Sequence, residues 1–276
     1  MIRSWNAFVD AVPTADLLTP SPPPKEIHMA SDFVWFELVT PDAKAAEAFY
    51  TSVVGWTTEA SSGPNGPYTI FKAGDFHVGG MLEMKGVPPG WLGYVGVDDV
   101  DAYAKKVEAA GGAVHKAPQD IPGVGRFAVV ADPQGAMFIL FRGSLDEAPP
   151  RPAPMSPGSL GWSELHAADW EKLFDFYAPL FGWVKHDTVP MGEMGVYQTF
   201  GPSAAAIGGM FNTFAPAHSP YWLYYFCVEG IDSALERVKA AGGQILTGPH
   251  PVPGGAWILN AQDPQGGLFA LVGQRG

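Results

Sequence analysis

An internal repeat is the feature that most constrains the fold of this chain. Trp35-Phe36-Glu37-Leu38 returns as Trp162-Ser163-Glu164-Leu165, at an offset of 127 residues. Further matches follow in the same order, and the offset drifts only from 127 to 131 along the chain. The other paired segments are 49–50 and 176–177, 55–56 and 182–183, 79–81 and 208–210, 109–112 and 240–243, and 132–135 and 263–266. Such a long period predicts two copies of one structural unit.

Composition excludes several classes of protein. Of the 276 residues, 47 % are hydrophobic and 16 % are charged, which is typical of a folded chain rather than a disordered one. The formal net charge of −12 opposes binding to nucleic acid or to an anionic membrane surface. No apolar run reaches the roughly 20 residues that span a bilayer, and the N-terminus has no export signal pattern. One cysteine fits a reducing compartment, so we expect a cytoplasmic protein.

Each copy has a repeated internal rhythm of strands and one helix. Residues 34–39 are β-rich, and Thr40-Pro41-Asp42 is a helix-start signal before apolar residues at helical spacing over 42–54. A stretch from Gly55, a turn at 63–66 and two strands over 68–72 and 76–84 complete a βαβββ module. The pattern then restarts, with expected segments at 91–97, 100–110, 113–117, 125–131 and 136–141. Each copy therefore holds two modules, and the predicted class is α+β with curved mixed sheets.

The repeat also predicts domain boundaries. We expect an N-terminal extension over 1–30, a first domain over 31–143 and a second domain over 159–274. Residues 144–158 contain five prolines and read as a semi-rigid linker. The extension allows three readings: a mobile arm, an arm packed on a sheet, or an upstream segment before a true start at Met29.

Pro-Asp precedes the first helix, Phe-Tyr and Gly-Trp lie near its end, and Asp-Pro-x-Gly precedes the last strand. Tandem βαβββ modules that carry these motifs in this order resemble the vicinal oxygen chelate superfamily. That superfamily includes glyoxalase I, bleomycin-resistance proteins and extradiol dioxygenases. The resemblance covers residues 32–143 and 159–273. It implies two glyoxalase-like domains packed as an intramolecular pseudo-dimer in a chain that is a monomer in the simplest case, with a small-molecule site in the cup of each sheet.

The resemblance also implies positions for a divalent metal, and these positions cannot ligate one. The first-strand position falls on Trp35 and Trp162, and the fifth-strand position falls on Leu92 and Leu223. The last-strand position falls on Ile139 and Ala270, and the fourth-strand position falls near Gly80-Met81 and Gly209-Met210. Metals bind nitrogen, oxygen and sulfur ligands, so we expect no metal cofactor in either copy.

Strand alternation then selects the residues that face each cup. If Trp35 faces the cup, Glu37 and Val39 face it too, and Trp162, Glu164 and His166 do so in the second copy. We expect catalytic roles for Glu164, His166 and Glu37, with His166 adding an acid–base partner that the first copy lacks. Ligand contacts are expected from Trp35, Trp162, Met81 and Met210. The simpler reading is that each Glu satisfies buried donors and each Trp fills the core.

The remaining candidates favour structural roles. Five histidines have no counterpart in the other copy and are expected to be at the surface or hydrogen-bonded: His77, His115, His186, His218 and His250. Cys227 lies in an apolar run without a neighbouring cation, which is typical of a small core residue rather than a reactive thiol.

Two functions are compatible with these residues. The first is a glyoxalase-like enzyme or former enzyme that acts on a small apolar or aromatic metabolite, without an assignable lyase or oxygenase class. The second is a protein that sequesters a drug or metabolite without turnover, as bleomycin-resistance proteins do. A purely structural role is a third alternative. An acid–base pair in a cup is needed only for turnover.

Overall fold

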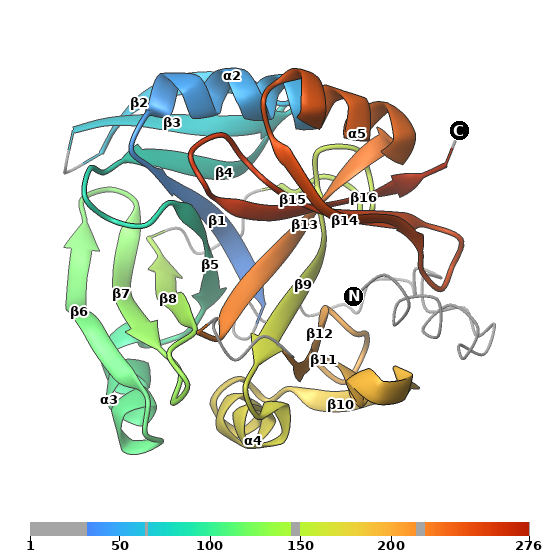
Figure 1. Ribbon diagram of the computed structural model, residues 1–276. Coiled ribbons are helices and arrows are strands. Elements are labelled where there is room, and N and C mark those ends of the chain that lie inside the picture. Colours follow the sequence, from blue (N-terminus) through green and yellow to red (C-terminus); the bar gives the residue numbers. More distant parts are fainter. Residues whose placement is uncertain (1–31, 64–65, 145–149, 214–218, 276) are drawn as a thin grey trace.

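The computed structural model describes residues 32–63, 66–144, 150–213 and 219–275, which form two eight-stranded sheets with helices packed on them (Figure 1). The expected N-terminal extension over 1–30 lies outside the described residues, as does part of the expected linker, 145–149. Within the described residues, no helix is long and apolar enough to cross a membrane.

The first copy forms one continuous sheet in the order β2-β3-β4-β1-β5-β8-β7-β6. Its two modules join where β1 pairs antiparallel with β5, while β1 pairs parallel with β4 on its other side. The elements are β1 (Phe33–Thr40), α2 (Ala43–Val54), β2 (Thr57–Gly63), β3 (Gly66–Ala73), β4 (Phe76–Glu83), β5 (Gly90–Gly96), α3 (Val100–Ala109), β6 (Ala113–Ile121), β7 (Gly125–Ala131) and β8 (Met137–Gly143). The predicted βαβββ rhythm is therefore confirmed.

The second copy repeats this topology in the order β10-β11-β12-β9-β13-β16-β15-β14. Its elements are β9 (Leu160–Ala167), α4 (Trp170–Phe181), β10 (Val184–Pro190), the short helix η1 (Gly192–Met194), β11 (Val196–Gly201), β12 (Gly208–Asn212), β13 (Tyr221–Gly230), α5 (Ile231–Ala240), β14 (Gln244–Pro251), β15 (Trp257–Gln262) and β16 (Leu268–Gln274). The expected α+β class with two tandem units is thus observed.

The repeated Asp and Gly residues begin and end the first helix of each copy. The Asp42 carboxylate accepts a hydrogen bond from the Ala45 amide, and Asp169 does the same for Lys172. Gly55 and Gly182 end the two helices in left-handed conformation, with φ of 89° and 66°. The ends of α2 and α4 therefore determine where the next strands, β2 and β10, begin.

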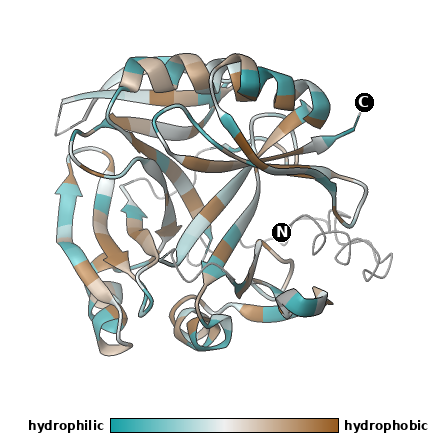
Figure 2. Cartoon of the chain, viewed as in Figure 1, coloured by the Kyte–Doolittle hydropathy of each residue, from teal (hydrophilic) through white to brown (hydrophobic). Residues whose placement is uncertain are grey.

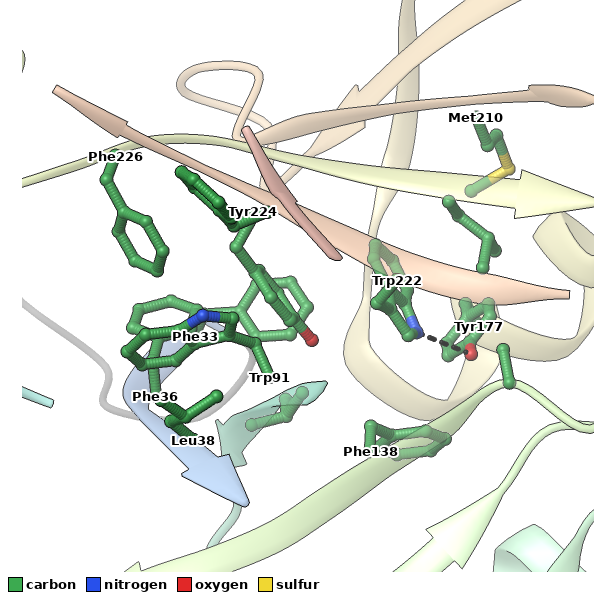
Figure 3. Close-up of a cluster of buried hydrophobic side chains, with 14 of the residues drawn as sticks. Phe33, Phe36, Leu38, Trp91, Phe138, Tyr177, Met210, Trp222, Tyr224 and Phe226 are labelled. Atoms are coloured by element: carbon green, nitrogen blue, oxygen red, sulfur yellow. Dashed lines mark hydrogen bonds between the residues drawn. The ribbon is translucent and has the colours of Figure 1, made fainter. Parts of the chain in front are cut away.

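An aromatic core lies between the two copies. Phe33 packs edge-on against Trp222 with ring centroids 5.2 Å apart, and Trp91 packs on Phe226 at 4.8 Å. Figure 3 shows these rings converging from both copies, and Figure 2 shows hydrophobic stretches along the central strands. The side chains on one face of each sheet are therefore buried between the copies and the helices, which leaves the opposite face for a site.

Two reciprocal hydrogen bonds cross this contact. The Tyr50 hydroxyl donates to Asp263 Oδ2 at 2.9 Å, and the Tyr177 hydroxyl donates to Asp132 Oδ2 at 2.9 Å. Each tyrosine belongs to the repeated Phe-Tyr pair, and each aspartate begins the repeated Asp-Pro-Gln-Gly of the other copy. The motifs that reveal the duplication thus also hold the two copies together.

Candidate small-molecule site in the first cup

The open face of the first sheet holds a cavity of about 960 Å³, which we call the first cup. Trp35, Glu37 and Val39 all line it, so the alternation expected for β1 places these three side chains on the cavity wall. The wall is completed mainly by apolar residues of the neighbouring strands, which include Ile70, Leu82, Leu92, Tyr94, Phe127, Val129, Ile139 and Phe141. A cavity of this size and character is typical of a small-molecule site.

A hydrogen-bonded relay holds the one carboxylate of β1 in this wall. Trp35 Nε1 donates to the Tyr68 hydroxyl at 3.1 Å, and that hydroxyl donates to Glu37 Oε2 at 3.2 Å. The Tyr94 hydroxyl is a further hydrogen-bonding neighbour of the Glu37 carboxylate. Burial raises the pKa of Glu37 above its ordinary value, while the two tyrosines and the charge of Lys116 oppose this rise.

The same relay exists in the second copy. Trp162 Nε1 donates to the Tyr197 hydroxyl at 2.7 Å, and Tyr197 donates to Glu164 Oε2 at 3.0 Å. Tyr225 donates to the other oxygen, Glu164 Oε1, at 3.0 Å. Sequence reasoning found the Trp and Glu of each relay but missed the tyrosines, although their offsets of 129 and 131 residues match the drift of the repeat.

The repeated glycine pair makes room for these tyrosines. Gly80 pairs with Glu37 on the adjacent strand, and a Cβ added at Gly80 would overlap the Tyr68 hydroxyl. Gly209 pairs with Glu164, and an added Cβ there would overlap the Tyr197 ring. The glycines therefore let each tyrosine cross the strand and reach the carboxylate.

The two cups differ in one row of side chains across three strands. In the first copy Val39 is flanked by Leu82 and Gly90, and all three line the cavity. The corresponding row of the second copy consists of Phe211, His166 and Tyr221. There the His166 ring stacks on Tyr221 with centroids 4.4 Å apart and packs against Phe211 at 4.7 Å.

This row surrounds Glu164 and His166, for which we expected catalytic roles. The expected pair of Glu164 and His166 does form, with His166 Nε2 and Glu164 Oε1 2.8 Å apart. Both residues are buried, however, with exposed fractions of 5 % and 9 %. Rings occupy all three positions of the row around this pair, whereas the first copy, with Val39 in place of His166, lines a cavity with the same row.

The two methionines lie away from the cups. Met81 and Met210 are 1 % and 0 % exposed and belong to the core on the other face of the sheets. Figure 3 shows Met210 in this core. Each is the strand neighbour of a glycine that faces the cup, and alternate residues point to opposite faces. We therefore do not retain Met81 and Met210 as ligand contacts.

The histidines and the cysteine take varied places. His77 lines the first cup near Glu59 at 3.8 Å, while His186 Nε2 contacts the Pro202 carbonyl at 2.9 Å. His115 is exposed, His250 is half-buried, and His218 lies outside the described residues. Burial raises the pKa of the Cys227 thiol to about 11, so this thiol stays protonated at neutral pH.

The donor set of the first cup does not fit a divalent metal. Trp35, Leu92 and Ile139, at the positions that the resemblance implies for ligands, all line the cavity and offer no ligating atom. In the described part of the chain, no group of three or more His, Cys, Asp or Glu residues could hold a metal ion.

Comparison with known proteins gives the family. Residues 32–140 and 159–271 match the Glyoxalase/Bleomycin resistance protein/Dioxygenase superfamily. The chain belongs to this superfamily. It is 33 % identical over 261 residues to the anthracycline biosynthesis protein DnrV of Streptomyces peucetius, covering 86 % of this chain and 91 % of that protein. It is 30 % identical over 245 residues to the putative glyoxylase CFP32 of Mycobacterium bovis, covering 86 % of this chain and 93 % of that protein.

Solved structures share the fold of this superfamily member at low sequence identity. The Mn(II)-bound glyoxalase from Novosphingobium aromaticivorans aligns with a TM-score of 0.63 and 19 % identity, covering 90 % of this chain and 83 % of that one. The 2,3-dioxygenase LapB from Pseudomonas sp. KL28 aligns with a TM-score of 0.62 and 15 % identity, covering 90 % and 94 %. At these identities the likeness concerns the fold.

Proposed function

We propose that the first cup binds one planar, apolar small molecule and that Glu37 is its polar anchor. The observation that carries this proposal is the 960 Å³ apolar cavity with the Trp35–Tyr68–Glu37 relay in its wall. Apolar walls supply affinity by removing ligand surface from water, and a fixed carboxylate selects a ligand with a hydrogen-bond donor. Binding in this form needs no metal.

The chemical class of the ligand follows from shape and from the relatives. The name of the Streptomyces peucetius protein refers to anthracycline biosynthesis, and anthracyclines are built on fused planar rings. A hydroxylated fused-ring aromatic would lie against Trp35, Tyr94 and Phe127 while its hydroxyl donates to Glu37. We propose this class of ligand for the first cup.

Calorimetric titration with a dihydroxyanthraquinone tests the site. We expect one molecule bound per chain and an affinity weakened about tenfold or more in Glu37→Gln, because a charged hydrogen-bond acceptor is lost. Glu164→Gln is the matched control and should leave the affinity within about twofold. Glu164 has the same relay in the second copy, where its side chain is buried. Equal effects of the two substitutions, or two molecules bound per chain, would contradict the assignment of the site.

Independence from metal is part of the proposal and has its own test. Elemental analysis of protein purified without chelator should give far less than one divalent ion per chain, because the residues at the family's ligand positions offer no ligating atoms. Near-equimolar zinc, nickel, iron or manganese would overturn this part of the proposal.

A catalytic role for the same site is the second candidate. Burial raises the pKa of Glu37, so this carboxyl exchanges its proton closer to neutral pH than an exposed one, as a general acid or base requires. Solvent-deuterium exchange into 2-tetralone, a fused-ring ketone with acidic C–H bonds, measures this activity. Exchange faster than in buffer and lost in Glu37→Gln would support turnover. Binding of the anthraquinone without any exchange would favour sequestration.

A further inference from the structure

The charges around the first cup differ in sign from the charge of the whole chain. The formal net charge is −12, yet Lys116, Arg142 and Arg151 line this cavity against only Glu37 and Asp98. Charges more than about 10 Å away are largely screened at physiological salt. The local cations, and not the total charge, therefore decide which ligand charge the cavity accepts.

Of these three cations, the two arginines already donate to backbone carbonyls. Arg142 donates to the Asp98 carbonyl at 2.7 Å, and Arg151 donates to the Phe33 carbonyl at 3.2 Å while it also lies 3.6 Å from Asp32.

The half-buried Lys116 amino group lies over the Phe127 ring in the cavity wall, 5.1 Å from its centroid. Among the described residues, no carboxylate lies within 4.0 Å of it.

The second copy lacks this cation. Lys116 on β6 pairs with Val129 on β7, and the equivalent pair in the second copy is Thr247 with Asn260. The two copies thus share the Trp, Tyr and Glu of the relay, while only the copy with the open cup adds an amino group beside it. The Trp, Tyr and Glu of the relay occur in both copies, so they are sufficient for the common fold. Lys116 occurs only beside the first cup, which indicates a role in ligand recognition.

We propose that the ligand of the first cup is an acidic aromatic compound whose carboxylate, or ionised phenol, pairs with Lys116. This inference rests on the proposed function and adds the charge of the ligand to it. Glu37 would accept a hydrogen bond from a hydroxyl on the ring system, and Lys116 would bind the anionic group at another edge of the same ring system. Neutral ring compounds would bind through the apolar walls and Glu37 without the pairing to Lys116.

The test compares anthraquinone-2-carboxylate with anthraquinone-2-carboxamide, which has a similar shape and no charge. At neutral pH and physiological salt, we expect the wild-type chain to bind the carboxylate about tenfold more tightly, the range for a hydrogen bond to a charged group. Lys116→Met should weaken only the carboxylate and bring the two affinities within about threefold. Lys116→Arg should keep the preference. Lys44→Met, the same change on the exposed face of α2, should leave both affinities unaltered.

Each outcome is decisive. Equal binding of the two compounds by the wild-type chain would overturn the acidic ligand and leave the proposed function standing. A preference that persists in Lys116→Met would overturn the role of Lys116. Failure of both compounds to bind would overturn the proposed function and this inference with it.

Discussion

Glu37 makes the stability of the chain depend on pH in a defined direction. Its folded-state pKa is raised above the ordinary value of 4.5, chiefly by burial. The folded chain therefore takes up this proton more readily than the unfolded chain. The resulting stabilisation is present below the ordinary pKa and is lost as the pH rises through the folded-state pKa.

Glu37→Gln should remove this dependence, because the amide does not titrate. The melting temperature of the variant relative to wild type should rise between about pH 4 and about pH 8. Differential scanning fluorimetry over this range measures the difference. Asp132 and Asp263, whose pKa values burial also raises, are present in both proteins and cancel. A difference that does not change with pH would show that Glu37 keeps its ordinary pKa.

Gly80 determines whether Tyr68 can reach Glu37. In Gly80→Ala the new methyl would overlap the Tyr68 hydroxyl and force the ring away from the carboxylate. We expect a loss of about 1–3 kcal/mol in the free energy of unfolding, typical of overpacking, together with weaker ligand binding. Urea denaturation measures the first effect. Gly90→Ala is the control, since an added Cβ meets nothing within 4 Å there; equal losses in the two variants would reject this role of Gly80.

At the scale of elements, the two copies differ in the row across β4, β1 and β5. The first copy places Leu82, Val39 and Gly90 in this row, and the second copy places rings at all three positions. Gly90 of β5 corresponds to Tyr221 of β13, which stacks on His166. A change at one position of one strand should therefore close the first cup.

Gly90→Tyr should convert the first cup toward the second. The substituted side chain would start in open space at the cavity wall and occupy the volume meant for the ligand. We expect a folded chain whose affinity for the dihydroxyanthraquinone falls at least tenfold, as measured by calorimetric titration beside a circular dichroism spectrum. Unchanged affinity in a folded Gly90→Tyr variant would place the ligand elsewhere.

At the scale of the whole molecule, the two copies depend on one another. The Trp91 indole donates to the Tyr50 hydroxyl at 2.9 Å, and that hydroxyl donates in turn to Asp263 of the other copy. The second copy has the equivalent arrangement, in which the Trp222 indole donates to the Tyr177 hydroxyl and Tyr177 donates to Asp132 of the first copy. A single core that spans both copies favours one cooperative unfolding transition.

Tyr50→Phe should lower the stability of the entire chain. The substitution leaves a buried carboxylate oxygen and an indole donor without their partner, which costs about 1–3 kcal/mol. Scanning calorimetry should still show one transition at a lower temperature, and Tyr177→Phe should behave in the same way. Two separate transitions in either variant would indicate that the copies unfold independently.

Gln134 breaks the pseudo-symmetry of this interface. Gln134 Oε1 accepts hydrogen bonds from the backbone amides of Ala168 and Asp169 at 2.8 and 3.0 Å. The equivalent Gln265 Oε1 is buried without a partner among the described residues. Pro41 occupies the position of Ala168 in the first copy, and proline has no amide hydrogen to donate.

The sequence by itself determined the duplication, the order of strands and helices, and the face of β1 on which Trp35, Glu37 and Val39 lie. These features depend on local signals, namely a repeat period, helix caps, turns and strand alternation, which are read along the chain. The Trp and Glu of each relay could be named for the same reason. The lack of ligating side chains at the positions that the resemblance implies for a metal also follows from residue type alone.

Only the tertiary structure revealed the cavity on the first sheet and what surrounds Glu37. Tyr68 and Tyr94 hydrogen-bond to this carboxylate, the charge of Lys116 on β6 acts on it, and Gly90 is the cross-strand neighbour of Val39. Those meetings depend on strand register and sheet order, which join residues tens of positions apart. The row that lines the first cup consists of rings in the second copy, and this difference in side-chain volume acts only where strands bring residues together.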